Sequence, residues 1–468
     1  MLAIYCTLTI AISVGAWVVH VRFRRGLLVS PVSVTYLLLA SIFGVRPLVL
    51  GAEQEWSLYG ANVEYGTELA ARIGLVATVA LTLGLIVDRL RPPTHARTTV
   101  HRVAAGASPY PLGMLPAVAI SAASSVLWFL AMAVIGGGFS FVRQLASGRS
   151  AEIASRLEGV PVLLSAIPVA GVIVLCVARM ALEQQRPLAK LEQILFLGAV
   201  VLAALPPLAL GNRRLLLPVA LAAVIAVCRP TWNRIVPLRL LVPALAIGMI
   251  IAALPFVRSA GSRVESGNLV ESLVLFFQEN GLGQTVRGFF VSYDTEMFDY
   301  IALVAPRLGD SMEFGGGRGT LGELLLQPIP AALSPWPTWS NTILTELFGG
   351  GCATVACPVP SVVGVLYFDL GIIGVAIGML LLGLYLRTLE RRLETAQGAP
   401  LVIVLTIASF MPSLIRGNTI SQLWIAFNVL IVALALRFVL RRLHPERDRE
   451  RSGALEALPS LPAQPGLR

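Results

Sequence analysis

Eleven long apolar runs recur along this 468-residue chain and constrain its fold more than any other feature. A helix needs roughly 20 apolar residues to cross the hydrocarbon of a bilayer. The runs lie near residues 1–20, 27–45, 69–87, 113–135, 161–179, 193–211, 215–228, 240–257, 362–386, 400–415 and 421–440. Backbone groups in lipid must be paired within the protein, and barrel strands would instead show alternating segments of ~10 residues. The sequence therefore predicts an all-α polytopic integral membrane protein with about 11 transmembrane helices, within a range of about 10 to 12.

The composition excludes an ordinary soluble domain. Hydrophobic residues make up 56% of the chain and charged residues 13%, whereas soluble domains carry about 25% charged residues. The net charge of +10 is explained by membrane topology, so we expect no nucleic-acid partner. The first run lacks a basic leading segment and a small-residue cleavage site, which favours a retained helix over a signal peptide.

Lysine and arginine concentrate in alternate connections between the apolar runs. Because cytoplasmic loops are enriched in these residues, the pattern predicts an outside N-terminus and a cytoplasmic C-terminus. It also places the longest connection outside. The first run adds almost no orienting charge, so its own orientation stays open.

That longest connection divides the chain. We expect an N-terminal group of about eight spans, a long external catalytic loop with short helices, a C-terminal group of spans, and a charged, Pro- and Ala-rich cytoplasmic tail that is disordered. The predicted boundaries are 1–256, 257–361, 362–440 and 441–468.

The long loop holds the side chains for chemistry on a phosphorylated sugar. Its carboxylates cluster in YDTEMFD, where Asp294 or Asp299 could act as general base on a sugar hydroxyl. Arg287 precedes this cluster, and Arg318 lies in the glycine-rich GGGRG run. Guanidinium groups bind phosphate oxygens in a bidentate way, and glycine lets backbone amides approach an anion.

Two tryptophans of the loop, Trp336 and Trp339, offer flat faces on which sugar rings could stack. Tryptophans near a membrane interface are more often anchors in the aromatic belt, and we expect that role for at least one of them.

Arginines also end several apolar runs on the predicted outer side, against the positive-inside trend. They are Arg46, Arg213, Arg214 and Arg416. Together with the long loop they predict a cationic basin, although single cases could reach lipid headgroups. In the segment before the fifth run, Arg143 either meets lipid phosphates from an interfacial helix or contacts substrate.

The first external loop is acidic and contains Glu53 and Glu55. Such a pair could form the carboxylate and metal site of a lipid-dependent glycosyltransferase, but a solvated acidic loop is the favoured interpretation. The sequence has no recognisable metal or nucleotide motif, so we expect no metal and no cofactor. An external enzyme of this kind would use a lipid diphosphate, which carries its own leaving group.

Two further features remain. Cys352 and Cys357 lie close together in the long loop, where oxidising conditions favour a disulfide, with two unpaired thiols as the alternative. Asp369 lies in an apolar run, where a carboxylate indicates either a functional group or a salt bridge to an arginine.

The order of these features resembles the oligosaccharide repeat unit polymerases (O-antigen polymerase, Wzy-type), over about residues 27 to 440. The pieces that carry the resemblance are, in order, VRPLVL, LALGNRRLLLPV, FVSYDTEMFDYIALVAP, EFGGGRGTLGELLLQPIPAAL, SPWPTWSN, SVVGVLYFDLGIIGVAIGMLLLGL and SLIRGNTISQLW. The resemblance implies metal-independent polymerisation of undecaprenyl-diphosphate-linked oligosaccharides on the outer face of the bacterial cytoplasmic membrane. It also implies a flippase and a chain-length-regulating co-polymerase as partners, besides membrane lipid.

The resemblance further implies that external arginines hold the diphosphates. Catalytic candidates are Asp294, Asp299, Arg287 and Arg318, and diphosphate-binding candidates are Arg143, Arg213, Arg214, Arg258, Arg307 and Arg416.

Three alternatives stay open. A ligase-like transferase would resemble this architecture, but its pattern includes an external histidine, which the predicted external segments lack. A polyprenyl-phosphate-sugar glycosyltransferase would use Glu53 and Glu55. A flippase or other transporter would favour inverted repeats and polar residues at mid-depth, which the sequence does not show.

Overall fold

The computed structural model describes residues 1–24, 30–90, 114–136, 138, 162–209, 213–229, 278, 287, 290–291, 295–327, 329, 339–348 and 358–443. Nine helical segments in this part are long and apolar enough to cross a membrane. They are formed by α1 (Leu2–Arg24), α2 (Pro31–Ala40) with η1 (Ser41–Val45) and α3 (Arg46–Glu53), η2 (Glu64–Gly66) with α4 (Thr67–Leu90), α5 (Met114–Ile135), α8 (Val162–Glu183), α9 (Lys190–Ala209), α16 (Ser361–Thr395), α17 (Gly398–Arg416) and α18 (Thr419–Leu443).

These helices confirm an all-α, multi-pass membrane protein. The run at 215–228 coincides with the shorter helix α10 (Arg213–Cys228), while the run at 240–257 and the tail from 444 onward lie outside the described residues. The count of eleven spans therefore stays a prediction.

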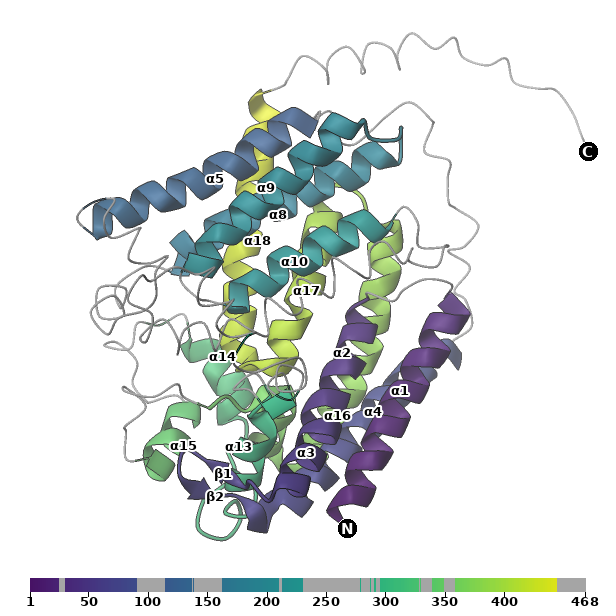
Figure 1. Cartoon of the computed structure of the whole chain (residues 1–468), viewed down its shortest axis with the longest axis vertical. Coiled ribbons are helices and arrows are strands. Elements are labelled where there is room, and N and C mark those ends of the chain that lie inside the picture. Colours follow the sequence, from purple (N-terminus) through teal and green to yellow (C-terminus); the bar gives the residue numbers. More distant parts are fainter. Residues whose placement is uncertain are drawn as a thin grey trace, which may run out of the picture.

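The bundle has two distinct ends (Figure 1). The N-terminus, the hairpin β1 (Ser57–Leu58)–β2 (Ala61–Asn62) and the short helices α13 (Met297–Val304), α14 (Glu323–Leu326) and α15 (Trp339–Phe348) gather at one end, which we call the loop end. The hairpin is antiparallel, with Ser57 opposite Asn62. The opposite end carries the turns after α8 and α16, where Gln397 Nε2 donates to Gln184 Oε1 at 3.4 Å.

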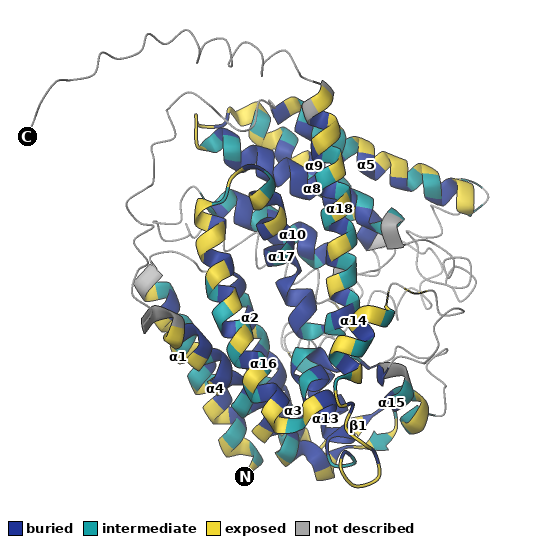
Figure 2. Cartoon of the chain, turned by 180° about the vertical axis from the view of Figure 1, so that it is seen from behind, coloured by how far each residue is buried: buried dark blue, intermediate teal, exposed yellow. Residues whose placement is uncertain are grey.

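Helices from before and after the long connection share one bundle. α16 packs against α4, and α17 packs against α10 and α2. Figure 2 shows buried faces turned between the helices and exposed faces turned outward. Many of the exposed side chains are large and apolar, for example Ile373 and Ile377 of α16 and Leu197 of α9. Such a surface fits a lipid environment.

Glycine lets α4 and α16 approach closely. A Cβ atom on Gly84 would lie 2.2 Å from the Leu380 carbonyl oxygen, and one on Gly383 would lie 2.4 Å from the Leu81 carbonyl oxygen. Small residues of this kind allow backbone contact between membrane helices. The crossing therefore holds the two halves of the chain together.

The second span delivers an arginine to the loop end. Ser30 caps α2 by accepting a hydrogen bond from the Ser33 amide at 3.0 Å, and Pro31 begins the helix. The π-helical turn η1 then interrupts the span just before Arg46. Such π-bulges often occur at functional sites.

Candidate functional site

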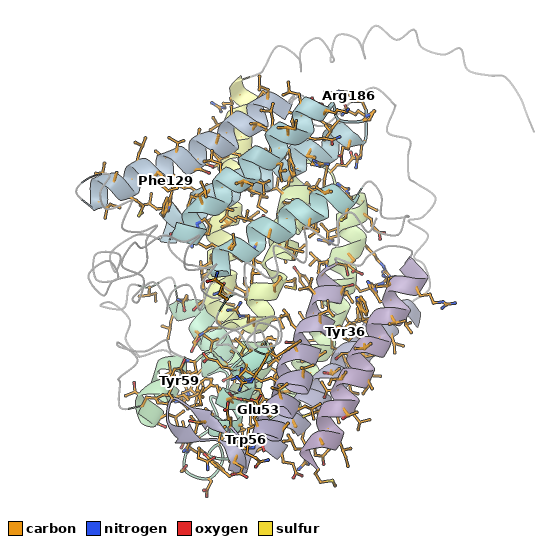
Figure 3. The ribbon with its side chains drawn as sticks, in the orientation of Figure 1. Tyr36, Glu53, Trp56, Tyr59, Phe129 and Arg186 are labelled. Carbon is orange, nitrogen blue, oxygen red and sulfur yellow. The ribbon has the colours of Figure 1, made fainter. Side chains whose placement is uncertain are left out.

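A cavity of about 840 Å³ lies at the loop end, between the first loop and the long loop. Its walls are Arg46, Leu50, Gln54, Glu55, Trp56, Ser57, Leu58, Tyr59, Gly60, Asn62, Arg287, Val291, Glu296 and Asp299. Figure 3 shows Glu53, Trp56 and Tyr59 together at this end, far from Phe129 and Arg186. The cavity thus joins two segments that are more than two hundred residues apart in sequence.

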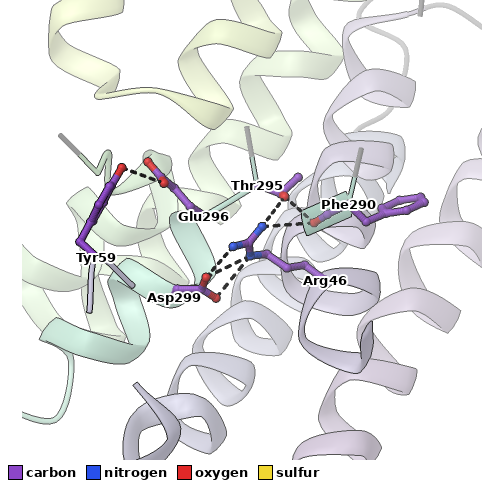
Figure 4. Close-up of polar contacts among 6 residues, drawn as sticks. All are labelled: Arg46, Tyr59, Phe290, Thr295, Glu296 and Asp299. Carbon is purple, nitrogen blue, oxygen red and sulfur yellow. Dashed lines mark hydrogen bonds and ion pairs between the residues drawn. The ribbon is translucent and has the colours of Figure 1, made fainter. Parts of the chain in front are cut away.

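Arg46 crosses from the second span to the long loop (Figure 4). Its Nη2 donates to Asp299 Oδ2 at 2.6 Å, and its Nε lies 3.3 Å from both carboxylate oxygens. Its Nη1 donates to Thr295 Oγ1 at 2.9 Å and to the Phe290 carbonyl at 3.3 Å. The side chains of Arg46 and Asp299 are 6% and 2% exposed. This buried pair fixes the start of α13 against α3.

Burial raises the pKa of the Asp299 carboxyl, and the Arg46 guanidinium opposes that shift. Both oxygens of Asp299 face Arg46, so a proton taken up there would disrupt the ion pair. The geometry therefore suits Asp299 to orienting Arg46 more than to abstracting a proton.

Glu296 is a second carboxylate in the cavity wall. Tyr59 donates its phenolic proton to Glu296 Oε2 at 3.1 Å, and Glu296 is 5% exposed (Figure 4). Tyr59 comes from the turn between β1 and β2, where its φ is 50°. A carboxylate in a cavity that arginine residues also line can accept a proton from a bound hydroxyl.

Arg287 faces the cavity from the long loop and binds the acidic first loop. Its Nε donates to Glu53 Oε1 and its Nη2 to Glu53 Oε2, both at 2.6 Å, and Nη2 also lies 3.2 Å from Glu55 Oε2. The hydrogen bond to Glu53 raises the pKa of Arg287. Because the Arg287 side chain is 43% exposed, an anionic ligand could reach it.

These contacts change two expectations from the sequence. The glutamates of the first loop are ion-paired with Arg287 as well as solvated, and the arginines that reach the cavity are paired with carboxylates. The cavity is therefore of mixed charge, not purely cationic. Within the described residues, no group of three metal-ligating side chains comes together.

A second cluster surrounds Arg318 at the same end. The Arg318 guanidinium lies 4.5 Å from the centroid of the Trp339 ring, and its Nε donates to the Gly315 carbonyl at 2.9 Å. Trp339 is 8% exposed, so one face of this predicted sugar-stacking ring is covered by Arg318. The Arg318 side chain itself is 59% exposed.

Asp369 lies beneath this second cluster. The arginine expected as its partner does not take that place, because the carboxylate accepts hydrogen bonds from the glycine-rich loop.

The other predicted site residues divide into three groups. Arg307 donates to the Leu303 carbonyl at 2.8 Å and lies over the Tyr65 ring, and Arg416 ends α17. Arg213 and Arg214 begin α10, but their side chains are not among those described. Outside the described residues lie Arg143, Arg258, Asp294, Trp336, Cys352 and Cys357.

Sequence reasoning gave Glu296 and Arg46 less weight than the structure does. The sequence places Glu296 in one carboxylate cluster with Asp294 and Asp299 but does not single it out as the base. It shows Arg46 only as an arginine at the end of a span. Tyr59 gave no signal in the sequence, because only the fold of the hairpin brings it to Glu296.

Comparison with family models, with curated proteins and with solved structures returns no match to this chain. Its function must be argued from the chemistry of its own site.

Proposed function

We propose that this membrane protein is a glycosyltransferase that joins undecaprenyl-diphosphate-linked oligosaccharide units on the outer face of the bacterial cytoplasmic membrane. The observation that carries the proposal is the cavity at the loop end, whose walls include Glu296 together with Arg46 and Arg287. A base next to cations suits a reaction in which a hydroxyl attacks and a diphosphate leaves.

The proposed reaction needs one base and one cationic group. The acceptor hydroxyl oxygen attacks the anomeric carbon of the donor sugar, while the bond from that carbon to the diphosphate oxygen breaks. The diphosphate leaves with the bonding electrons and Glu296 takes the proton. Arg287 stabilises the departing diphosphate, because guanidinium binds such oxygens strongly without a metal.

The diphosphate would have to replace a carboxylate on Arg287. Glu53 and Glu55 hold that guanidinium in the absence of substrate, and their side chains are 29% and 60% exposed. A surface ion pair of this kind is weak, because water and salt screen both charges. A ligand carrying more negative charge can therefore take the arginine while the glutamates turn to water.

The rest of the lining suits a sugar. Gln54, Ser57 and Asn62 can hydrogen-bond hydroxyl groups, and Trp56 and Tyr59 add aromatic surface. The ordered resemblance to the O-antigen polymerases favours repeated transfer, which makes polymer, over a single ligase-like transfer. The distribution of lysine and arginine between the apolar runs supports a cytoplasmic C-terminus and an external loop end. A flippase and a chain-length-regulating co-polymerase would work beside the protein.

The test uses purified protein with synthetic undecaprenyl-diphosphate oligosaccharide in excess EDTA, and reads product length on a gel. We expect a ladder from wild type, almost none from Glu296→Gln, and a reduction of about 10²-fold or more from Arg287→Ala. The matched control is Glu64→Gln, because Glu64 is an exposed carboxylate of the first loop that does not line the cavity.

The outcomes separate the candidate functions. A ladder that survives EDTA and depends on Glu296 supports the polymerase. One added unit without a ladder points to a ligase-like transferase, and a requirement for metal together with Glu53 points to the metal-dependent class. No product from any cognate lipid-linked sugar contradicts the proposal and favours transport.

A further inference from the structure

The glycine-rich loop at 315–320 is docked onto a break in α16. Within that helix Gly371 has φ 65° and ψ −157°, outside the helical region. Such a break leaves preceding carbonyl groups without helical partners. The Phe368 carbonyl accepts from the Gly315 amide at 3.0 Å, and the Asp369 carbonyl accepts from the Gly316 amide at 2.8 Å. The loop amides therefore provide hydrogen-bond donors for carbonyl groups that the break in the helix leaves without helical partners.

The Asp369 side chain binds the next part of the same loop. Its Oδ1 accepts from the amides of Gly317 at 2.8 Å and Gly319 at 3.0 Å. Its Oδ2 accepts from the Thr320 amide at 3.0 Å and from the Thr320 hydroxyl at 2.5 Å. Asp369 is fully buried. Successive amides of this kind form a nest that binds an anion, and here a carboxylate of the chain itself fills it.

The fit requires glycine at two positions. A Cβ atom on Gly315 would lie 2.3 Å from Asp369 Oδ1, and one on Gly319 would lie 2.8 Å from Trp339 Cδ1. A side chain at either place would push the loop away from the carboxylate or from the ring. The glycines are thus explained by contact with Asp369 and Trp339.

The docked loop fixes Arg318 between two of the amides bound to Asp369. The guanidinium rests on the Trp339 ring and on the Gly315 carbonyl, yet more than half of the side chain is exposed. An arginine that is already oriented loses less conformational freedom when it binds a ligand. The Arg318 guanidinium is therefore held in one orientation before any ligand binds.

Arg318 also lies beside an apolar surface. Leu321 and Leu325 are 68% and 73% exposed. Trp424 of α18 donates to the Leu324 carbonyl at 3.1 Å, and the neighbouring Phe427 is 48% exposed. The exposed face of a membrane helix therefore continues onto α14, next to the cation. A phosphate attached to a lipid chain matches this combination.

We propose that Asp369 is a positioning residue that holds the 315–320 loop so that Arg318 is aimed at the phosphate of a lipid-linked ligand. The inference takes its ligand, a lipid-linked oligosaccharide diphosphate, from the proposed function, whereas the contact between Asp369 and the 315–320 loop stands independently of that function.

The test compares Asp369→Asn, Arg318→Ala and the double variant. The control is Asp310→Asn, because Asp310 is an exposed carboxylate that lies before the 315–320 loop. An amide offers one acceptor where the carboxylate has two. In Asp369→Asn we therefore expect the amides of Gly317, Gly319 and Thr320 to exchange hydrogen about tenfold faster or more. We also expect phenylglyoxal to label Arg318 faster in this variant. In Asp369→Asn the KM for the lipid-linked oligosaccharide should rise about tenfold, while kcat should change less than about twofold.

The double variant decides whether Asp369 acts through Arg318. We expect it to be no worse than Arg318→Ala alone, since residues that act as a unit are not additive. Equal losses from Asp369→Asn in both backgrounds, or unchanged exchange at the three amides, would overturn the inference. If wild type makes no product, the proposed function fails, and the labelling rate of Arg318 still decides the positioning: a faster rate in Asp369→Asn supports it and an unchanged rate overturns it.

Discussion

The most consequential single contact is the buried pair of Arg46 and Asp299, which joins the second span to the long loop. Removing water from two charges is costly, so such a pair adds little net stability compared with apolar residues of the same size. Losing only one partner is different, because the other charge stays buried without compensation. The pair is therefore best understood as a device that specifies how the loop docks.

This interpretation predicts the stability of variants. Arg46→Met should destabilise the protein by about 3–5 kcal/mol, because Asp299 is left buried and unpaired. The double variant Arg46→Met/Asp299→Leu should recover much of that loss. Thermal or denaturant unfolding of the purified protein in detergent measures both. A double variant less stable than the single one would contradict the interpretation.

The same residues predict a pH dependence. Burial raises the pKa of Asp299, and Arg46 opposes the shift, so Arg46→Met should raise that pKa further. A carboxyl whose folded pKa exceeds its unfolded value of about 3.9 loses stability as pH rises from the unfolded value through the folded one. The destabilisation caused by Arg46→Met should thus be small near pH 4 and grow toward pH 7. Unfolding measured across that range checks the sign, and a loss that shrinks as pH rises would refute it.

At the scale of elements, the contact between α4 and α16 depends on backbone approach at Gly84 and Gly383. The two helices belong to the third span and to the span that follows the long loop, so their contact joins the parts of the chain before and after that loop. The break at Gly371 acts in the same helix, because it ends the first part of α16 where the glycine-rich loop docks. Both features use glycine for a geometric reason.

Alanine substitution separates a glycine that is needed from one that is not. Gly383→Ala should destabilise the protein by about 1–3 kcal/mol, because its Cβ would overlap the Leu81 carbonyl oxygen. Gly198→Ala is the matched control, because a Cβ there meets nothing within 4 Å, and alanine favours a helix over glycine by about 1 kcal/mol. Melting temperatures compare the two. Equal effects would show that the close crossing of α4 and α16 contributes nothing.

At the scale of the whole molecule, the two ends of the bundle differ in character. The loop end brings together the hairpin, α13 and the glycine-rich loop, whereas the opposite end carries a second buried polar contact. There His20 Nε2 of α1 lies 3.2 Å from Glu390 Oε1 of α16. The positive-inside pattern of the sequence predicts that the loop end faces the outside of the cell.

Labelling of single cysteines tests this topology. In a background whose five native cysteines are replaced, we expect Glu64→Cys and Asp310→Cys to react with a membrane-impermeant maleimide on intact cells. Gln185→Cys and Gln397→Cys, which lie at the opposite end, should react only after permeabilisation. Labelling of all four from outside would contradict a single orientation, and the reverse pattern would invert it.

The fold class and the positions of the nine spans in the described part of the chain could be predicted from the sequence, because a membrane helix depends on a local property. Apolar length and internally satisfied backbone groups identify each span without knowledge of its neighbours. For the same reason the arginine at the end of the second span and the carboxylates of the long loop were visible as candidates. The sequence does not show which of these candidates form the cavity and which only support it.

Tertiary structure alone decided which of these groups meet. Arg46 and Asp299 are separated by 253 residues, and Arg287 and Glu53 by 234, so their pairing depends on how α4, α13 and α16 pack. The sequence leaves open whether Asp369 is a functional carboxylate or the partner of an arginine. In the structure, the break at Gly371 allows backbone amides to bind Asp369 instead. The sequence determined which charged side chains the protein places near a membrane surface. Only the crossing of distant helices decided their partners, because a contact between remote residues is a property of packing and not of local pattern.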